Sequence, residues 1–160
     1  YARQPKPLQG SLWVDGILYI RLSGSAAAVT HTAKQWGGDE VADSDDLWRK
    51  FCEMTHPFFN GPTPLWRFSM RPTAAMDEHC GNWLIDWGGA QRFLRGEQDQ
   101  ALLQRMASDA RGHVTLYSGG DRNIEVRHPL NPVEQTLQKR LKNSFDPAGI
   151  LNPGRLYSWM

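Results

Sequence analysis

The chain has 160 residues, about the length of one domain, and can bury about two thirds of its unfolded surface around a single core. Its 18 basic and 17 acidic residues leave a net charge of +1, which gives no reason to expect nucleic acid or an anionic membrane as the main partner. No apolar run reaches the ~20 residues that span a bilayer, and no basic segment followed by an apolar one opens the chain.

Composition divides the chain into three parts. Residues 1–10 are rich in proline and resemble an interdomain linker, whereas residues 146–160 begin with a segment of alternating prolines and glycines that stops a helix and makes turns. The folded domain is therefore expected over 11–145, followed by a C-terminal tail over 146–160.

Hydrophobic periodicity and turn residues predict the elements of the domain in chain order. They are a strand over 17–22, helices over 25–36 and 43–55, a strand over 65–71, a hairpin over 83–94, a helix over 97–111, a strand over 113–118 and a helix over 131–145. Three of the helices begin at residues that favour an N-cap, Ser25, Asp43 and Asn131. The order predicts an α+β fold, an antiparallel sheet with helices packed on one face around a ferredoxin-like core.

If helices cover one face of the sheet, the other face carries the side chains that point away from them. The strand patterns place there Tyr19, Arg21, Arg67, Ser69, Arg71, Arg92, Thr115 and Tyr117. Several guanidinium groups on one face suit a carboxylate ligand, because each can bind it through two hydrogen bonds. On pattern alone, an ordinary solvated sheet face explains the set equally well.

Other functional motifs are absent from the sequence. The five histidines have no metal-site spacing, and the adjacent pair His79-Cys80 lacks the two further ligands of a structural zinc. Cys52 and Cys80 fit no Cys-x-x-Cys pattern and indicate reduced thiols of a cytoplasmic protein. There is no nucleophile elbow, Walker loop or dinucleotide-binding glycine motif, and the motif of an RNA-binding ferredoxin-like sheet is also lacking.

The tail carries the most specific motif. Residues 144–155 read Ser-Phe-Asp-Pro-Ala-Gly-Ile-Leu-Asn-Pro-Gly-Arg and closely resemble the C-terminal signature of FAD-linked oxidases of the vanillyl-alcohol oxidase type. In that signature a helix ends in Asp-Pro-x-Gly-Ile-Leu-Asn-Pro-Gly-Lys, and Arg155 stands where the family usually has lysine. The Leu-Trp-Arg strand at 65–67, the hairpin over 83–94 and the loop over 56–59 are similar to the FAD-binding subunits of bacterial glycolate oxidases, C-terminal part only.

The resemblance implies a flavoprotein of two domains. Its N-terminal domain binds the FAD pyrophosphate through a Gly-rich loop, and its cap domain covers the isoalloxazine ring with a sheet. This chain matches only the cap, over 11–145, and the tail, so FAD is expected in the longer protein and not in this chain alone. By the same resemblance, the tail returns to the FAD-binding domain, and Asn152, Pro153 and Gly154 lie nearest the cofactor.

The implied reaction is the oxidation of glycolate to glyoxylate by hydride transfer to FAD. Related catalytic subunits carry a His-x-Gly-Asp-Gly-Asn-x-His segment that is absent here, so an accessory or electron-relaying role is expected, together with other glycolate oxidase subunits, and the isolated chain is expected to be inactive. Arg67, and less favourably Arg71, are the candidates for a 2-hydroxy acid carboxylate. The protein is expected in the cytoplasm, reaching a membrane only through its partners. A non-catalytic subunit-interaction module is the alternative.

Overall fold

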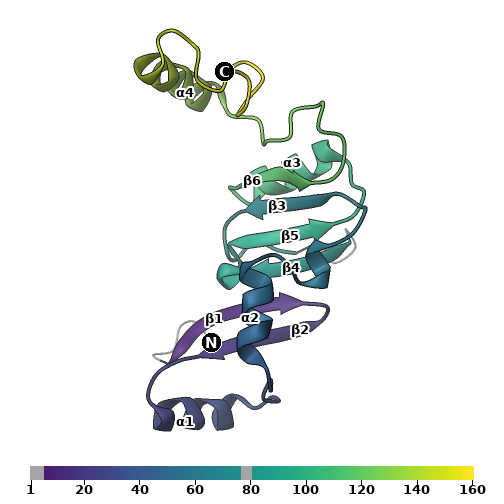
Figure 1. Ribbon diagram of the computed structural model, residues 1–160, viewed down its shortest axis with the longest axis vertical. Helices are drawn as coiled ribbons and strands as arrows, with labels where there is room; N and C mark the ends of the chain where they lie inside the picture. Colours follow the sequence, from purple (N-terminus) through teal and green to yellow (C-terminus); the bar gives the residue numbers. More distant parts are fainter. Residues whose placement is uncertain (1–5, 77–80) are drawn as a thin grey trace.

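The computed structural model describes residues 6–76 and 81–160, and in this part of the chain six strands form one antiparallel sheet (Figure 1). The strands are β1 (Leu8–Val14), β2 (Ile17–Leu22), β3 (Leu65–Ser69), β4 (Asn82–Asp86), β5 (Gln91–Arg95) and β6 (His113–Ser118). Across the sheet they lie in the order β2-β1-β4-β5-β3-β6. The predicted pair His79-Cys80 lies outside the described residues.

The described helices are α1 (Ala26–Trp36), α2 (Ser44–Cys52), α3 (Gln100–Asp109) and α4 (Pro132–Phe145). The predicted caps are confirmed, because Ser25, Asp43 and Asn131 each accept a hydrogen bond from a backbone N–H of the first turn. At α4 the Glu134 side chain also accepts from the backbone N–H of Asn131, which completes a capping box. Local side-chain chemistry therefore sets where the helices begin.

The strand β1 lies partly within the Pro-rich segment that was expected to be a linker. It begins at Leu8 and pairs with β2 through a tight turn at Asp15 and Gly16, both of which have positive φ angles, 51° and 79°. Leu12 and Val14 are buried on one face, and the next strand inward, β4, pairs with β1 at Trp13 and Val14. The β1–β2 hairpin thus extends the sheet at one edge.

Four strands and α3 form the expected ferredoxin-like core. In the order β4-β5-β3-β6, β5 lies between β3 and β4 and is antiparallel to both, which is the split arrangement of that core. In the connection from β3 to β4, where the ferredoxin-like core has its first helix, residues 70–76 form a turn and loop.

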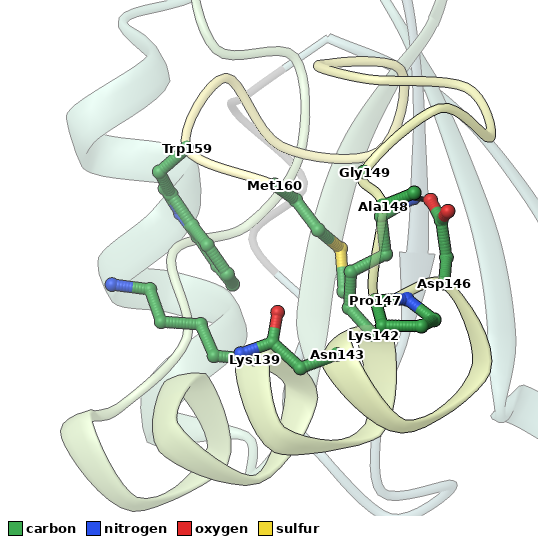
Figure 2. A pocket seen from close by; sticks show the side chains of 9 residues that line it. All are labelled: Lys139, Lys142, Asn143, Asp146, Pro147, Ala148, Gly149, Trp159 and Met160. Carbon is green, nitrogen blue, oxygen red and sulfur yellow. Dashed lines mark hydrogen bonds and ion pairs between the residues drawn. The ribbon is translucent and has the colours of Figure 1, made fainter.

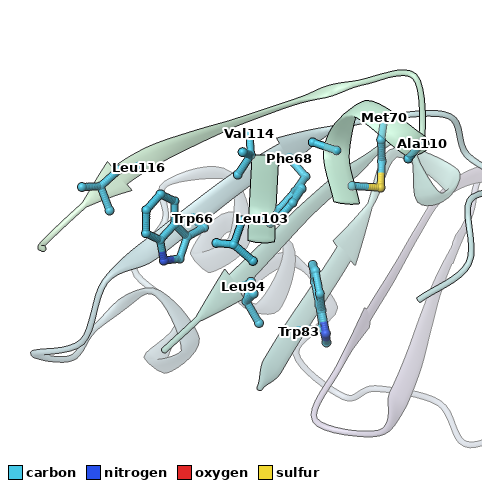
Figure 3. Packing of buried hydrophobic residues seen from close by; sticks show 10 residues of the cluster. Trp66, Phe68, Met70, Trp83, Leu94, Leu103, Ala110, Val114 and Leu116 are labelled. Carbon is cyan, nitrogen blue, oxygen red and sulfur yellow. The ribbon is translucent and has the colours of Figure 1, made fainter. Parts of the chain in front are cut away.

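The α+β class is confirmed, but α2 and α3 pack on opposite faces of the sheet and not on one. Along β4 and β5, Trp83 and Leu94 belong to a cluster under α3, whereas their neighbours Leu84 and Phe93 belong to a cluster under α2. Adjacent residues of a strand point to opposite faces, so the sheet has a core on each side. Figure 3 shows the α3 side, where Leu103 lies among Trp66, Phe68 and Leu94.

Helix α4 and the tail lie beyond the β6 edge of the sheet (Figure 1). The apolar residues that give α4 its predicted amphipathic stripe are exposed, at 53 to 80% of their accessible surface; they are Val133, Leu137, Leu141 and Phe145. The expectation that this helix helps to cover the sheet is therefore wrong. The amphipathic pattern shows that α4 has an apolar face, but it does not specify what covers that face. Here the face is open to solvent.

Candidate functional site in the sheet cavity

A cavity of about 770 Å³ lies on the α2 face of the sheet, and we call it the sheet cavity. Strands β1, β3, β4 and β5 contribute its floor, and α2, together with Met54 two residues beyond its end, contributes one wall. The polar and aromatic residues that line it include Arg67, Gln91, Asp86, Trp48, Trp87 and Tyr117. Its size exceeds that of a small carboxylic acid and lies in the range of ligand pockets.

Sheet register brings the polar lining residues together. Gln91 of β5 lies opposite Ser69 of β3 on one side and opposite Asp86 of β4 on the other. These three residues form a polar row across three strands, beside a row in which Phe93 of β5 lies opposite Arg67. Residues opposite each other share a face, and Arg67, Asp86, Gln91 and Phe93 of these two rows line the floor of the sheet cavity.

Arg67 is held in a fixed direction by the polar row. Its Nε and Nη2 atoms donate to Oε1 of Gln91 at 3.0 and 2.7 Å, and its side chain is partly buried. A guanidinium has five N–H donors, so two hydrogen bonds leave capacity for a ligand. Among the described residues Arg67 forms no ion pair. Its charge is therefore available to an anion in the cavity.

Asp86 ends β4 and begins the turn of the predicted hairpin. Its Oδ1 accepts a hydrogen bond from the backbone N–H of Trp87 at 2.7 Å, and burial raises the pKa of its carboxyl. The turn itself is confirmed at the predicted glycines: Trp87, Gly88 and Gly89 have φ angles of 50°, 61° and 102°. A Cβ at position 89 would lie 2.6 Å from the Pro72 carbonyl oxygen, so the close approach requires glycine.

The two arginines of β5 have structural roles on opposite faces. Arg92 was predicted on the open face, but it lies on the α3 side, 3% exposed, and donates to the carbonyl oxygens of Gly89, Pro72, Ala74 and Ala75. Arg95 lies on the cavity side and donates to carbonyls of the loop over 58–63. Burial lowers the pKa of both guanidinium groups. Both arginines therefore fix loops.

Of the other residues predicted on this face, some line the sheet cavity and some do not. Tyr117 and Arg21 line the sheet cavity; the Tyr117 hydroxyl donates to Sδ of Met54, and the Arg21 guanidinium lies 5.9 Å from the Trp48 ring centre. Thr115 lies opposite Arg67. Arg71 follows the end of β3, is exposed, and is not among the cavity residues. The structure thus places Arg67, and not Arg71, at the cavity.

Sequence reasoning missed Gln91 and Asp86, although both lie in the predicted hairpin. Neither belongs to a functional motif, and neither stands out by its polarity, because β4 also carries Asn82 and β5 also carries Arg92 and Arg95. Their alignment with Arg67 depends on the strand order and on the pairing of β5 with β3 and β4. A polar residue on each of two neighbouring hairpin strands was the available signal.

The tail is an ordered set of turns (Figure 2). The carboxylate of Asp146 accepts from the backbone N–H groups of Ile150 and Leu151 at 3.0 and 2.9 Å and from Nζ of Lys142 at 2.5 Å. These bonds, the ammonium first, lower the pKa of Asp146. Ile150 and Leu151 remain 74% and 57% exposed. Asp146, the first residue of the tail, therefore fixes the backbone of a turn on which both apolar side chains are exposed.

The predicted cofactor residues Asn152, Pro153 and Gly154 continue these turns and are exposed. Asn152 and Gly154 have positive φ angles, 47° and 69°, and the N–H of Gly154 donates to the Met160 carbonyl at 2.6 Å. Figure 2 shows the neighbouring hollow of about 230 Å³, with the Met160 side chain pointing toward α4 and Trp159 beside Lys139. The three residues lie far along the chain from the sheet cavity and do not line it.

The sequence has no Gly-rich pyrophosphate loop at the start of a helix. Within residues 6–76 and 81–160 no cluster of three metal-binding side chains occurs, and none of the helices there has the length and hydropathy to cross a membrane. Cys52 is an exposed thiol.

Comparisons with known proteins agree with the tail motif. Residues 119–156 match the family described as FAD linked oxidases, C-terminal domain. The chain is 38% identical over 155 residues to the glycolate oxidase subunit GlcE of Escherichia coli (strain K12). These aligned residues make up 97% of this chain and 43% of that protein. No solved structure gives a significant match. The predicted relationship is confirmed, and the chain spans less than half the length of this relative.

Proposed function

From the sequence relationship of this chain to the C-terminal part of FAD-linked oxidases and of a glycolate oxidase subunit, we propose that it is the cap domain of a glycolate oxidase flavoprotein subunit. In the longer protein, FAD is bound by a preceding domain, and the cap supplies the sheet that faces the flavin ring. The partners are the other subunits of the oxidase, and the substrate is a 2-hydroxy acid. The isolated chain is inactive because it does not contain the cofactor site.

The observation that carries the substrate assignment is the sheet cavity with Arg67 in it. A 2-hydroxy acid is an anion at neutral pH, and its carboxylate matches the planar donors of a guanidinium. Arg67 is partly buried and already oriented by Gln91, so little side-chain freedom is lost when it binds a ligand. We assign the carboxylate to Arg67. Arg71, the second candidate, is the natural comparison because it is an exposed arginine two residues beyond the end of the same strand.

The tail and α4 form the contact with the FAD-binding domain in this proposal. Their exposed apolar side chains include Leu137, Phe145 and Ile150, and burying them against a neighbouring domain removes apolar surface from water. Asn152, Pro153 and Gly154 follow directly and are the residues closest to the cofactor. Because Asp146 and Lys142 hold the turn, the tail is already shaped for this contact.

Within the oxidase we assign an accessory or electron-relaying role to this subunit. The supporting observation is that the sequence lacks the His-x-Gly-Asp-Gly-Asn-x-His segment of related catalytic subunits. The alternative is a non-catalytic module that joins subunits. The apolar face of α4 supports that alternative as well, because such a face serves an interface between subunits as well as one between domains.

Purification of the full-length gene product distinguishes the two functions. The cap-domain proposal predicts a yellow protein with the absorbance of a bound flavin, whereas the 160-residue chain expressed alone folds and stays colourless. A colourless full-length protein that still assembles with the other subunits contradicts the flavin proposal and supports the interaction module. Tight, saturable FAD binding by the 160-residue chain contradicts the assignment of the main cofactor site to another domain.

A further inference from the structure

The sheet cavity contains a second charged group that the carboxylate assignment does not use. Asp86 lines the cavity from β4, on the far side of Gln91 from Arg67. Cross-strand neighbours have Cβ atoms roughly 5 Å apart, so the Asp86 side chain starts about that far from Gln91. The guanidinium of Arg67 approaches the same glutamine within hydrogen-bond distance, at 2.7 Å. A cation and a carboxyl group therefore flank one short polar side chain.

The carboxyl group of Asp86 is incompletely paired. Oδ1 accepts from the Trp87 backbone N–H, and within the described residues Asp86 has no ion-pair partner and no hydrogen bond to its Oδ2 atom. Asp86 is partly buried, and a ligand that shields the rest of its carboxyl group from water must supply a donor to offset the loss of hydration. The side chain faces the cavity, so a donor on a bound ligand can reach it.

A 2-hydroxy acid carries the two groups that complement this pair. Its carboxylate needs a cation, and its hydroxyl, on the adjacent carbon, donates one hydrogen bond. An acid without the hydroxyl satisfies Arg67 and leaves Asp86 unpaired, which is the situation in which polar sites discriminate strongly between analogues.

We propose that Asp86 accepts the hydroxyl hydrogen bond of the 2-hydroxy acid whose carboxylate binds Arg67, and thereby selects hydroxy acids over unsubstituted acids. This inference rests on the proposed function, since it uses the same cavity and the same substrate class. The raised pKa of Asp86 is consistent with a carboxyl that lacks a cationic partner. Asp86 is a specificity-determining residue in this account, and the turn hydrogen bond to Trp87 orients it.

The test compares two acids that differ only in the hydroxyl. In 2-hydroxyisobutyrate the C2 carbon has no hydrogen, so the acid binds without being oxidised, and isobutyrate lacks the hydroxyl. Dissociation constants of both are measured by calorimetry on the assembled full-length oxidase. The native complex is expected to bind the hydroxy acid about ten-fold or more tightly, the difference that one hydrogen bond to a charged group supplies.

Two substitutions separate recognition from the structural role of Asp86. Asp86→Ala is expected to abolish the difference between the two acids and leave the affinity for isobutyrate unchanged. Asp86→Asn keeps an oxygen that can accept from Trp87 N–H, so it preserves the turn, yet it is expected to reduce the difference because a neutral acceptor is weaker. Asp39→Asn removes one exposed carboxylate outside the cavity and serves as the control.

A third substitution, Arg67→Ala, distinguishes a failure of the Asp86 inference from a failure of the carboxylate assignment to Arg67. If it weakens both acids equally while both Asp86 variants keep the native ratio, the Asp86 inference is overturned and the proposed function stands. If Arg67→Ala changes neither affinity, the carboxylate site is not in this cavity, and the Arg67 assignment and the inference fail together, whereas a colourless full-length protein is what contradicts the proposed function. Thermal unfolding of each variant checks that it is folded, and Asp86→Asn gives the answer if Asp86→Ala is not.

Discussion

The Arg67 guanidinium donates two hydrogen bonds, from Nε and Nη2, to a single acceptor, Oε1 of Gln91. The two residues come from the neighbouring strands β3 and β5, where Gln91 lies two residues before Phe93, the residue opposite Arg67, so the bonds join the two strands. It holds a long flexible side chain in one direction on the floor of the sheet cavity. This pairing explains how an arginine with no acidic partner among the described residues is ordered before any ligand binds.

The Gln91 pairing predicts opposite effects for two substitutions. Gln91→Ala frees Arg67, and the affinity of the full-length oxidase for glycolate is expected to fall a few-fold because the side chain must be ordered on binding. Gln91→Glu places a carboxylate beside Arg67 that competes with the substrate, so a larger fall, of about ten-fold or more, is expected. Steady-state Michaelis constants for glycolate measure both. A Gln91→Glu variant with unchanged affinity contradicts the assignment of Arg67 to the carboxylate.

Removal of the Arg92 side chain is expected to lower the stability of the fold strongly. Its guanidinium donates to four carbonyl oxygens and joins the hairpin turn to the loop over 72–75. Arg92→Ala leaves these buried acceptors unsatisfied, and the free energy of unfolding is expected to fall by about 3 kcal/mol or more. Arg105→Ala, an exposed arginine on α3, is the matched control and is expected to change it by less than about 0.5 kcal/mol. Urea unfolding of both variants measures the difference, and equal midpoints argue against this role.

Asp146 predicts a local effect in the tail. Asp146→Ala removes the acceptor for the N–H groups of Ile150 and Leu151 and the partner of Lys142. Hydrogen exchange of those two amides is expected to become faster, while exchange in β3 and β5 stays unchanged because the tail lies beyond the edge of the sheet. Asp109→Ala, at the end of α3, is the control. Unchanged protection at Ile150 and Leu151 means that the turn does not depend on Asp146.

His56 predicts a loss of stability in mild acid. Its ring stacks on the Phe51 ring with 4.4 Å between the ring centres, and its Nδ1 accepts a hydrogen bond from the backbone N–H of Phe58. Burial lowers the pKa of His56 below the ordinary value of 6.5. The unfolded chain therefore binds a proton before the folded protein does, and stability is expected to fall as the pH drops below about 6.5. Burial lowers the pKa of His128 as well, so it contributes in the same direction.

The contribution of His56 is measured by chemical unfolding at pH 7.5 and 5.5. In His56→Asn the amide oxygen can still accept from the Phe58 N–H, but the group no longer titrates. The loss of stability between the two pH values is expected to be smaller in the variant than in the native chain, with His128 accounting for the remainder. The same pH dependence in both proteins contradicts the role of His56.

Local chemistry made much of the fold predictable. Ser25, Asp43 and Asn131 cap the predicted helices, and the hairpin turn lies at Gly88 and Gly89 as expected. These features depend on a few neighbouring residues, which a sequence shows directly. The strand β1 was missed because the prolines before it indicated a linker, whereas its pairing with β2 and β4 involves residues elsewhere in the chain.

The faces of β5 were harder to predict for a different reason. Arg92, Phe93, Leu94 and Arg95 do not alternate between polar and apolar, because the strand is covered on both faces. Arg92 was therefore assigned to the open face. The structure shows that it shares the α3 face of the sheet with Leu94, two residues further along β5. The apolar stripe of α4 was also visible in the sequence, but an amphipathic pattern does not show which surface, if any, covers the apolar face of a helix.

The central claim is that Arg67 binds the substrate carboxylate in the sheet cavity, and the Michaelis constant for glycolate of the full-length oxidase tests it most directly. Arg67→Ala is expected to raise this constant about ten-fold or more, Arg67→Lys to raise it less because the charge is kept without the paired donors, and Arg71→Ala to leave it unchanged. An unchanged Michaelis constant in a folded, flavin-containing Arg67→Ala variant contradicts the claim.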